Sequence, residues 1–217
     1  MVRIKISSKN FKKVIGETVE VIKMGGVATV PTDTVYGLIA DATNEKAVRK
    51  IFKIKKRSLK KPIPIFVKDL KMAKSLAIIN KNQEKFLKKF WPGKLTAILK
   101  AKNKKLPKGI LKNGKIGLRI PNYKLVNILL EKLNFPLTGT SANISGKPGS
   151  TKIREVLKQF ENQFSTRSGG GQPDLILDAG NLKPSLPSTV IDLENLEILR
   201  EGEIPKEKIF KILKQKK

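Results

Sequence analysis

The first forty residues constrain the fold most, because they combine a helical pattern, a glycine stop and a strand that ends in a polar loop. Apolar residues recur at helical spacing from Phe11 to Ile22, and two glycines follow shortly after, which predicts an amphipathic helix. Residues 27–30 (VATV) then predict a short inner strand. We expect this strand to deliver residues 31–38 to its carboxyl end, where ligands of α/β sheets tend to bind.

The rest of the chain mixes helical and strand patterns without strict alternation. Further helices are predicted at 45–57 after the N-cap Asn44 and at 69–77, 82–90, 123–133, 153–160 and 205–217, and strands at 63–67, 95–99, 116–120, 137–140, 175–177, 189–193 and 196–200. Pro64 favours an edge or irregular strand, because proline has no N–H to donate. We predict one α/β domain over residues 1–217, with a core at about 8–204, a basic C-terminal helix at 205–217, and a twisted, mixed β-sheet flanked by helices.

The chain of 217 residues contains no cysteine and no histidine. Without cysteine it can form no disulfide and no thiolate metal site. Without histidine it has no Ser-His-Asp triad, no histidine-ligated zinc and no ordinary general base near neutral pH. We therefore assign no side chain as an acid or base catalyst, and expect any chemistry to depend on positioning and electrostatics.

The net charge is +28, because 46 lysines and arginines outnumber 18 acidic residues. Such a surplus favours phosphate-rich partners such as nucleotides or RNA, although a lysine-rich surface can equally serve solubility. The N-terminus lacks the long apolar core of a signal peptide. No apolar run approaches the ~20 residues of a membrane helix. We expect a cytoplasmic protein without a membrane partner.

Two polar segments are candidates for a ligand site. Residues 31–38 (PTDTVYGL) hold two threonine hydroxyls, a carboxylate and a phenol, and residues 55–62 (KKRSLKKP) add a cluster of cations. A hydroxyl-lined turn near fixed cations suits an anionic ligand, although a capped strand–helix junction beside solvated lysines would show the same pattern. Residues 145–148 (SGKP) look like a fragment of a Walker A loop, but the proline and the glycine spacing exclude that motif.

Five motifs in this order resemble the YrdC/Sua5 family of threonylcarbamoyl-AMP synthases. They are Pro31–Leu38, Lys55-x-Arg57, Ser141–Gly146 (SANISG), Pro187–Val190 (PSTV) and Leu199-Arg200. The likeness runs from about residue 25 to about residue 202, and the chain resembles the short YrdC form, which lacks the C-terminal domain of Sua5. The resemblance implies an enzyme that joins L-threonine, bicarbonate or CO2, and ATP into threonylcarbamoyl-AMP and pyrophosphate, for the N6-threonylcarbamoyladenosine modification of tRNA.

The resemblance assigns residues to the two substrates position by position. For threonine it implies Thr34, Phe66, Arg119, Gly139 and Ser188; for ATP it implies Lys55, Arg57, Lys61, Lys115, Ser141, Asn143, Gly149 and Arg200. Arg119 is expected to pair with the threonine carboxylate. Phe66 stands where many long members carry histidine, so we expect an apolar wall for the substrate methyl in place of an imidazole contact.

The resemblance also implies cofactors and partners. Mg²⁺ is expected to enter on the phosphates of ATP, with no metal ligand from the protein. The expected downstream partner is the tRNA threonylcarbamoyltransferase machinery, and the sequence leaves open whether tRNA or double-stranded RNA binds directly.

Two other functions compete with this prediction. The first is a non-catalytic module that binds double-stranded RNA or tRNA; it fits the +28 charge and predicts binding that weakens steeply with salt. The second is the carbamoyl-adenylate module of hydrogenase maturation. That module lies beside zinc-finger and acylphosphatase domains, which a cysteine-free chain of this length does not contain.

Overall fold

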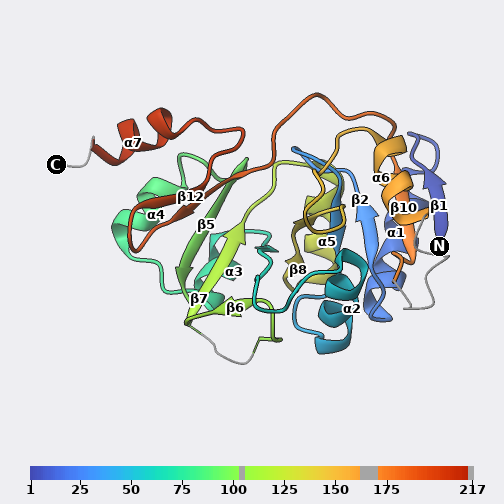
Figure 1. Cartoon of the computed structure of the whole chain (residues 1–217), viewed down its shortest axis with the longest axis horizontal. Coiled ribbons are helices and arrows are strands. Elements are labelled where there is room, and N and C mark those ends of the chain that lie inside the picture. The colour runs from blue at the N-terminus through green and yellow to red at the C-terminus, as the bar shows by residue number, and fades with distance from the viewer. Residues whose placement is uncertain (103–105, 162–170, 215–217) are drawn as a thin grey trace.

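The computed structural model describes residues 1–102, 106–161 and 171–214, and these form an α/β structure with two mixed β-sheets (Figure 1). In chain order the described elements are β1 (Val2–Lys5), α1 (Phe11–Lys23), β2 (Ala28–Val30), β3 (Gly37–Ile39), α2 (Glu45–Lys55), β4 (Ile65–Phe66), α3 (Leu70–Leu76), α4 (Lys81–Leu87), β5 (Leu95–Lys100), β6 (Leu111–Lys112), β7 (Lys115–Arg119), α5 (Lys124–Leu133), β8 (Leu137–Thr138), β9 (Thr140–Ser141), α6 (Ile153–Glu161), β10 (Leu175–Asp178), β11 (Thr189–Asp192), β12 (Glu197–Arg200) and α7 (Lys206–Lys214). The predicted α/β class is confirmed. Residues 215–217 of the predicted last helix lie outside the described residues.

The two sheets differ in strand order and lie side by side. Sheet A has the order β1-β10-β2-β3-β9, in which β1, β10 and β2 are parallel and β3 is antiparallel to both neighbours. Sheet B has the order β12-β11-β5-β7-β4-β8, with β6 beside β7. Figure 1 shows sheet B on the left and sheet A on the right, with the two chain ends on opposite sides.

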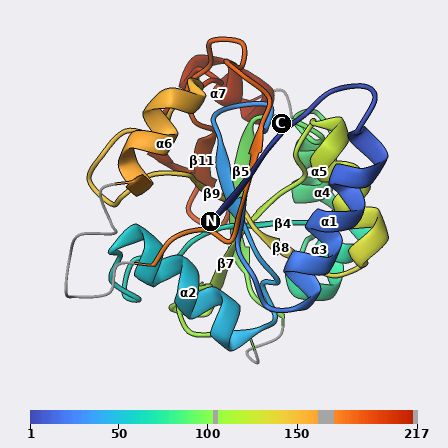
Figure 2. The ribbon, with the colours of Figure 1, turned by 90° about the vertical axis from the view of Figure 1, so that its right-hand side faces the viewer.

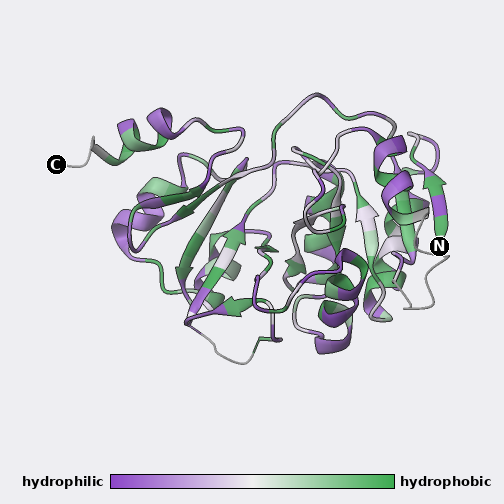
Figure 3. Ribbon diagram, viewed as in Figure 1, coloured by the Kyte–Doolittle hydropathy of each residue, from purple (hydrophilic) through white to green (hydrophobic). Residues whose placement is uncertain are grey.

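Helices cover both faces of sheet A, as Figure 2 shows. On one face, α1 and α5 pack against β2 and β10 in a core that includes Ile22, Leu129 and Leu177. On the other face, α2 and α6 pack in a larger core that includes Ile51 and Phe160 and continues under sheet B. The hydropathy colouring in Figure 3 follows this arrangement, with apolar strands inside and helices that are polar on their outer sides.

Local capping explains why several helices begin where the sequence predicts. The side chain of Asn44 accepts hydrogen bonds from the backbone of Lys46 and Ala47 at the start of α2, and Asp69 accepts one from Met72 at the start of α3. Such caps satisfy backbone donors that lack a partner within the helix. None of the described helices is long and apolar enough to cross a membrane.

The single sheet that the sequence predicts is instead two sheets, and Gly139 marks the point where the chain passes between them. The predicted strand 137–140 is two short strands: β8 pairs with β4 in sheet B, and β9 pairs with β3 in sheet A. A Cβ at Gly139 would lie 2.5 Å from the ring of Phe66. Only glycine allows this close approach. Glycine at this position therefore lets the chain pass from sheet B into sheet A, and the two sheets meet along this stretch of chain.

Of the two alternatives predicted for strand 63–67, an edge position or an irregular strand, the edge position is wrong, and the strand is short, Ile65–Phe66. β4 lies between β7 and β8 and pairs with both of them. Pro64 precedes the strand, so its missing N–H removes no bond from the ladder, and its carbonyl accepts a hydrogen bond from Gly139. The first strand, β1, was not predicted, because an exposed edge strand of alternating basic residues gives a weak hydrophobic pattern.

Candidate active site

A cavity of about 280 Å³ lies at the junction of the two sheets. Eleven of the thirteen residues that the sequence assigns to the site line it: Thr34, Lys55, Arg57, Phe66, Arg119, Gly139, Ser141, Asn143, Gly149, Ser188 and Arg200. They come from the loop after β2, from β4 and β7, from the end of α2 and from the segments around β9, β11 and β12. The segment between β10 and β11, which runs along the top of Figure 1 from sheet A toward sheet B, adds Ser188 to the wall. Segments distant in sequence therefore converge on one hollow.

The loop after β2 presents a fixed pair of hydroxyls. Thr32 Oγ1 donates to the carbonyl of Val35 at 2.6 Å and accepts from the backbone N–H of Thr34 at 3.1 Å. The two threonine hydroxyls are 3.1 Å apart, so Thr34 Oγ1 is the donor between them. Thr32 was not assigned to the site from the sequence, although it belongs to the motif at residues 31–38.

Arg119 is a buried cation of the cavity, with 4% of its surface exposed. Its Nε donates to the carbonyl of Gly93 at 2.8 Å, its Nη2 to Asp33 Oδ1 at 2.6 Å, and its Nη1 to Thr34 Oγ1 at 3.3 Å. Burial lowers the pKa of Arg119, and Asp33 opposes this shift. Arginine nevertheless stays charged in proteins, so the site holds a permanent, oriented guanidinium.

Phe66 forms the apolar wall beside Arg119. The guanidinium carbon of Arg119 lies 5.7 Å from the centre of the Phe66 ring, within the range of a cation–π contact. Gly139 lies close to the same ring, because a Cβ at that position would come within 2.5 Å of it. The wall therefore combines a fixed cation with a flat apolar surface, which suits a small ligand with one carboxylate and one methyl group.

Lys55 is buried, with 2% of its surface exposed, and its ammonium points into the loop that follows β9. It donates to the carbonyls of Ser141 and Asn143 at 2.5 and 2.9 Å and to Asn143 Oδ1 at 3.1 Å. Burial, together with the charge of Arg57, lowers the pKa of Lys55 to about 7. Lys55 lines the cavity as predicted, but its three donors fix the Ser-Ala-Asn loop rather than point toward a ligand.

Two further arginines face the cavity and are oriented by backbone carbonyls. Arg57 donates through Nε to the carbonyl of Lys61 at 2.7 Å and through Nη2 to that of Pro62 at 3.1 Å. Arg200 donates to the carbonyl of Ser188 through Nε at 3.2 Å and Nη2 at 2.7 Å. Burial lowers the pKa of Arg200, and so do the charges of Arg119 and Arg57. The arginines therefore repel one another, and an anion between them would relieve that repulsion.

The structure places two predicted residues outside this cavity. The side chain of Lys61 is exposed and does not line it. Lys115 lines a neighbouring cavity of about 500 Å³, where its ammonium contacts Asp192 at 2.7 Å and Glu194 at 3.2 Å. Arg57 and Arg200 line both cavities, so the two are adjacent.

The neighbouring cavity is more apolar than the first. Its wall includes Ile63, Ile98, Ile110, Val190 and Leu199. A flat, largely apolar group can bind between such side chains while a charged group attached to it reaches the shared arginines. The pair of cavities therefore fits an extended ligand with an apolar end and an anionic end.

Comparison with known proteins gives a consistent result. The family model Sua5/YciO/YrdC, described as telomere recombination, matches residues 20–202. The chain is 38% identical over 206 residues to a putative threonylcarbamoyl-AMP synthase of Methanocaldococcus jannaschii, covering 94% of this chain and 93% of that protein. It is 34% identical over 197 residues to the threonylcarbamoyl-AMP synthase of Pyrococcus abyssi, covering 88% of this chain and 55% of that protein.

Solved structures agree with these sequence matches. The structure of P. abyssi Sua5 complexed with L-threonine matches with a TM-score of 0.83 and 31% identity, covering 98% of this chain and 60% of that one. E. coli YciO matches with a TM-score of 0.77 and 28% identity, covering 93% of this chain and 94% of that one. The chain thus spans little more than half of the P. abyssi protein, but nearly the whole of the M. jannaschii protein and of YciO.

Proposed function

The chain belongs to the Sua5/YciO/YrdC family, and from this premise we propose that it is a threonylcarbamoyl-AMP synthase. The proposed reaction joins L-threonine, bicarbonate or CO2, and ATP into threonylcarbamoyl-AMP and pyrophosphate, for the N6-threonylcarbamoyladenosine modification of tRNA. One observation carries the proposal: three arginines converge on a single hydroxyl-lined cavity that no carboxylate lines among the described residues. Such a cavity is suited to hold two anionic reactants together.

The cavity offers a binding mode for threonine. The guanidinium of Arg119 would pair with the substrate carboxylate, and the ring of Phe66 would contact its methyl group. Ser188, whose hydroxyl lies 2.9 Å from Thr96 Oγ1, lines the same space. The complex of P. abyssi Sua5 with L-threonine, a protein of the same fold, supports this choice of substrate.

The two adjacent cavities would divide the nucleotide between them. The triphosphate would lie beside Arg57 and Arg200, which line both cavities. The adenosine would occupy the larger, more apolar cavity, where Lys115 lies. This arrangement keeps the predicted role of Lys115 near the nucleotide while placing it away from the threonine.

The chemistry explains why a chain without histidine suffices. Threonine's neutral amine adds CO2 and loses a proton, which yields a carbamate. A carbamate oxygen then attacks the α-phosphorus of ATP, the bond from that phosphorus to the bridging oxygen breaks, and pyrophosphate leaves with the electron pair. The attacking oxygen is already deprotonated, so this step needs no general base. The protein's task is to align two anions and to offset the charge on the phosphates.

Mg²⁺ would enter with the nucleotide. The described residues contain no group of three or more acidic side chains that could hold a metal ion, whereas the serine and asparagine oxygens of the cavity are neutral. This donor set fits an ion held mainly by phosphate oxygens and its own waters. When bound, the ion would neutralise part of the phosphate charge, and the arginines would offset the rest of that charge.

The test is to follow pyrophosphate release from ATP in the presence of Mg²⁺, bicarbonate and threonine. We expect release that requires both threonine and bicarbonate, and that falls about 100-fold in Arg57→Ala. Lys60→Ala is the matched control, because Lys60 is exposed and does not line the cavity. Absence of threonine-dependent release in the wild-type protein would refute the proposed activity.

An RNA-binding module without catalysis is the second candidate, because the net charge is +28. That function would give RNA binding that weakens steeply with salt and does not depend on Arg57 or Thr34. We propose in addition that the labile product passes to a tRNA threonylcarbamoyltransferase, since an anhydride between a carbamate and a phosphate is readily hydrolysed in water.

A further inference from the structure

Lys147 differs from every other cation of the cavity. It lines the cavity together with Lys55, Arg57, Arg119 and Arg200. Those four donate hydrogen bonds to carbonyls or side chains of the protein. Within residues 1–102, 106–161 and 171–214, the ammonium of Lys147 forms no hydrogen bond and no ion pair. It is therefore the cation of this cavity whose donors are all available to a ligand.

The backbone at Lys147 is fixed although its side chain is not. Asn143 Nδ2 donates to the carbonyl of Ile144 at 2.9 Å and to that of Lys147 at 2.6 Å. The N–H of Lys147 donates to the carbonyl of Ile144 at 3.0 Å, and Gly146 adopts a φ of +87°, which permits the tight turn. A rigid turn thus carries an exposed side chain at the margin of the cavity.

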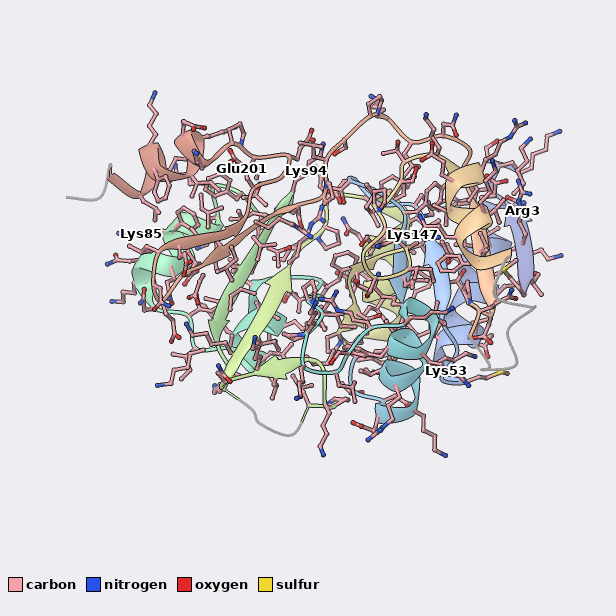
Figure 4. All side chains as sticks on the ribbon, in the orientation of Figure 1. Arg3, Lys53, Lys85, Lys94, Lys147 and Glu201 are labelled. Atoms are coloured by element: carbon pink, nitrogen blue, oxygen red, sulfur yellow. The ribbon has the colours of Figure 1, made fainter. Side chains whose placement is uncertain are left out.

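The position of Lys147 also separates it from the other surface lysines. Figure 4 labels it to the right of the middle, near the sheet A side of the junction, whereas Lys85 is labelled at the far left end near α4. The sequence excluded residues 145–148 as a Walker A loop, and the structure confirms that no helix begins there. The Ser-Gly-Lys turn nevertheless brings an ammonium with no partner among the described residues to the cavity that the three arginines line.

We propose that Lys147 binds the terminal two phosphates of the nucleotide and stabilises the pyrophosphate as it leaves; this inference rests on the proposed function. When the bond between the α-phosphorus and the bridging oxygen breaks, the electron pair stays on that oxygen, so negative charge increases on the pyrophosphate. The arginines are already oriented by backbone carbonyls and cannot follow this change. A flexible lysine can move with the departing group, and interactions that strengthen during bond cleavage accelerate it.

The experiment compares Lys147→Ala and Lys147→Arg with Lys158→Ala. Lys158 is the matched control, because it is exposed on α6, shortly after the turn, and does not line the cavity. Binding of inorganic pyrophosphate is measured by calorimetry, and turnover is measured at saturating threonine and ATP. In Lys147→Ala we expect the affinity for pyrophosphate to fall about 10-fold and kcat to fall about 10- to 100-fold, with an unchanged KM for threonine. Lys147→Arg should retain most of both, because it keeps the charge.

Two results would overturn the inference. One is that Lys147→Ala binds pyrophosphate and turns over like the wild-type protein. The other is an equal loss in Lys158→Ala, which would mean that only the overall positive charge matters. Failure of the proposed function has a different signature, because the wild-type protein would then release no pyrophosphate in response to threonine, while the calorimetric comparison would still test Lys147.

Discussion

Replacing Lys55 by methionine should cost stability at alkaline pH and almost none at neutral pH. The ammonium of Lys55 is buried against three oxygens of residues 141 and 143, at 2.5, 2.9 and 3.1 Å. Methionine keeps the length of the stem but removes every donor. At pH 9 the neutral amine of wild-type Lys55 supplies two N–H groups, and at about 1 kcal/mol for each lost bond we expect a loss of about 2 kcal/mol. At pH 7 the cost of burying the charge of wild-type Lys55 offsets the stability that its hydrogen bonds contribute, so the substitution changes stability little.

The sign of the pH effect follows from the pKa of Lys55. Burial, with a further contribution from Arg57, lowers it from 10.5 to about 7 in the folded protein. Between these values the unfolded chain binds more protons than the native one, so the free energy of unfolding rises with pH. The free-energy penalty of burying the charged form of Lys55 is fully present below about pH 7 and is relieved as the pH rises toward 10.5. From pH 7 to pH 9 the wild-type protein should gain about 2 kcal/mol from this group.

Urea denaturation at pH 7 and pH 9 tests this reasoning. The variants are Lys55→Met and the control Lys53→Met, whose side chain is exposed in the last turn of the same helix. Subtracting the pH effect in each variant from that in the wild-type protein cancels the other titrating groups. The reasoning is refuted if Lys55→Met keeps the wild-type pH dependence, or if Lys53→Met loses it to the same extent.

Two further predictions concern the wall of the threonine site. Asp33→Asn should raise the KM for threonine about 10-fold and leave the KM for ATP unchanged, because a neutral amide orients Arg119 less firmly than the carboxylate at 2.6 Å. Steady-state kinetics with each substrate varied in turn will measure both KM values. Equal changes in the two values would contradict the prediction. Gly139→Ala should destabilise the fold by about 2 kcal/mol, because the new Cβ would lie 2.5 Å from the Phe66 ring. Thermal denaturation will measure the loss, and the double variant with Phe66→Leu should recover part of it; no loss in the single variant would show that the contact is not tight.

The sequence predicts helices in this fold better than it predicts strand pairing. The spacing of apolar residues and the caps at Asn44 and Asp69 are local, so α1, α2 and α3 lie close to their predicted ranges. Strand order depends on partners far along the chain. The division of residues 137–140 between two sheets depends on β3 and β4, which no local pattern reveals.

For the candidate site, sequence motifs predict which residues lie there, but only the fold shows what each side chain contacts. Motifs identified eleven residues that line one cavity, but they could not show what each side chain does there. Lys55 was expected at the triphosphate and instead donates to the Ser-Ala-Asn loop. The side chain of Lys61 is expected at the nucleotide, whereas in the structure the backbone carbonyl of Lys61 orients Arg57. A lysine-rich segment gives no sign of which ammonium group is buried.

The way in which the arginines are oriented explains how the cavity keeps its charge. Among the described residues, Arg57 donates to backbone carbonyls, and Arg200 donates to the carbonyl and the hydroxyl of Ser188. These neutral groups fix a guanidinium without neutralising it. Of the three arginines, Arg119 is the one with a carboxylate partner in the described part of the chain, and that partner, Asp33, does not line the cavity. Carboxylates at the same positions would have oriented the arginines equally well but would have cancelled the field that an anionic ligand requires. The pKa of Arg200 is lowered mainly by burial and further by the charges of Arg119 and Arg57. The repulsion among the three arginines is thus the cost of a site that stays positive before its substrates arrive.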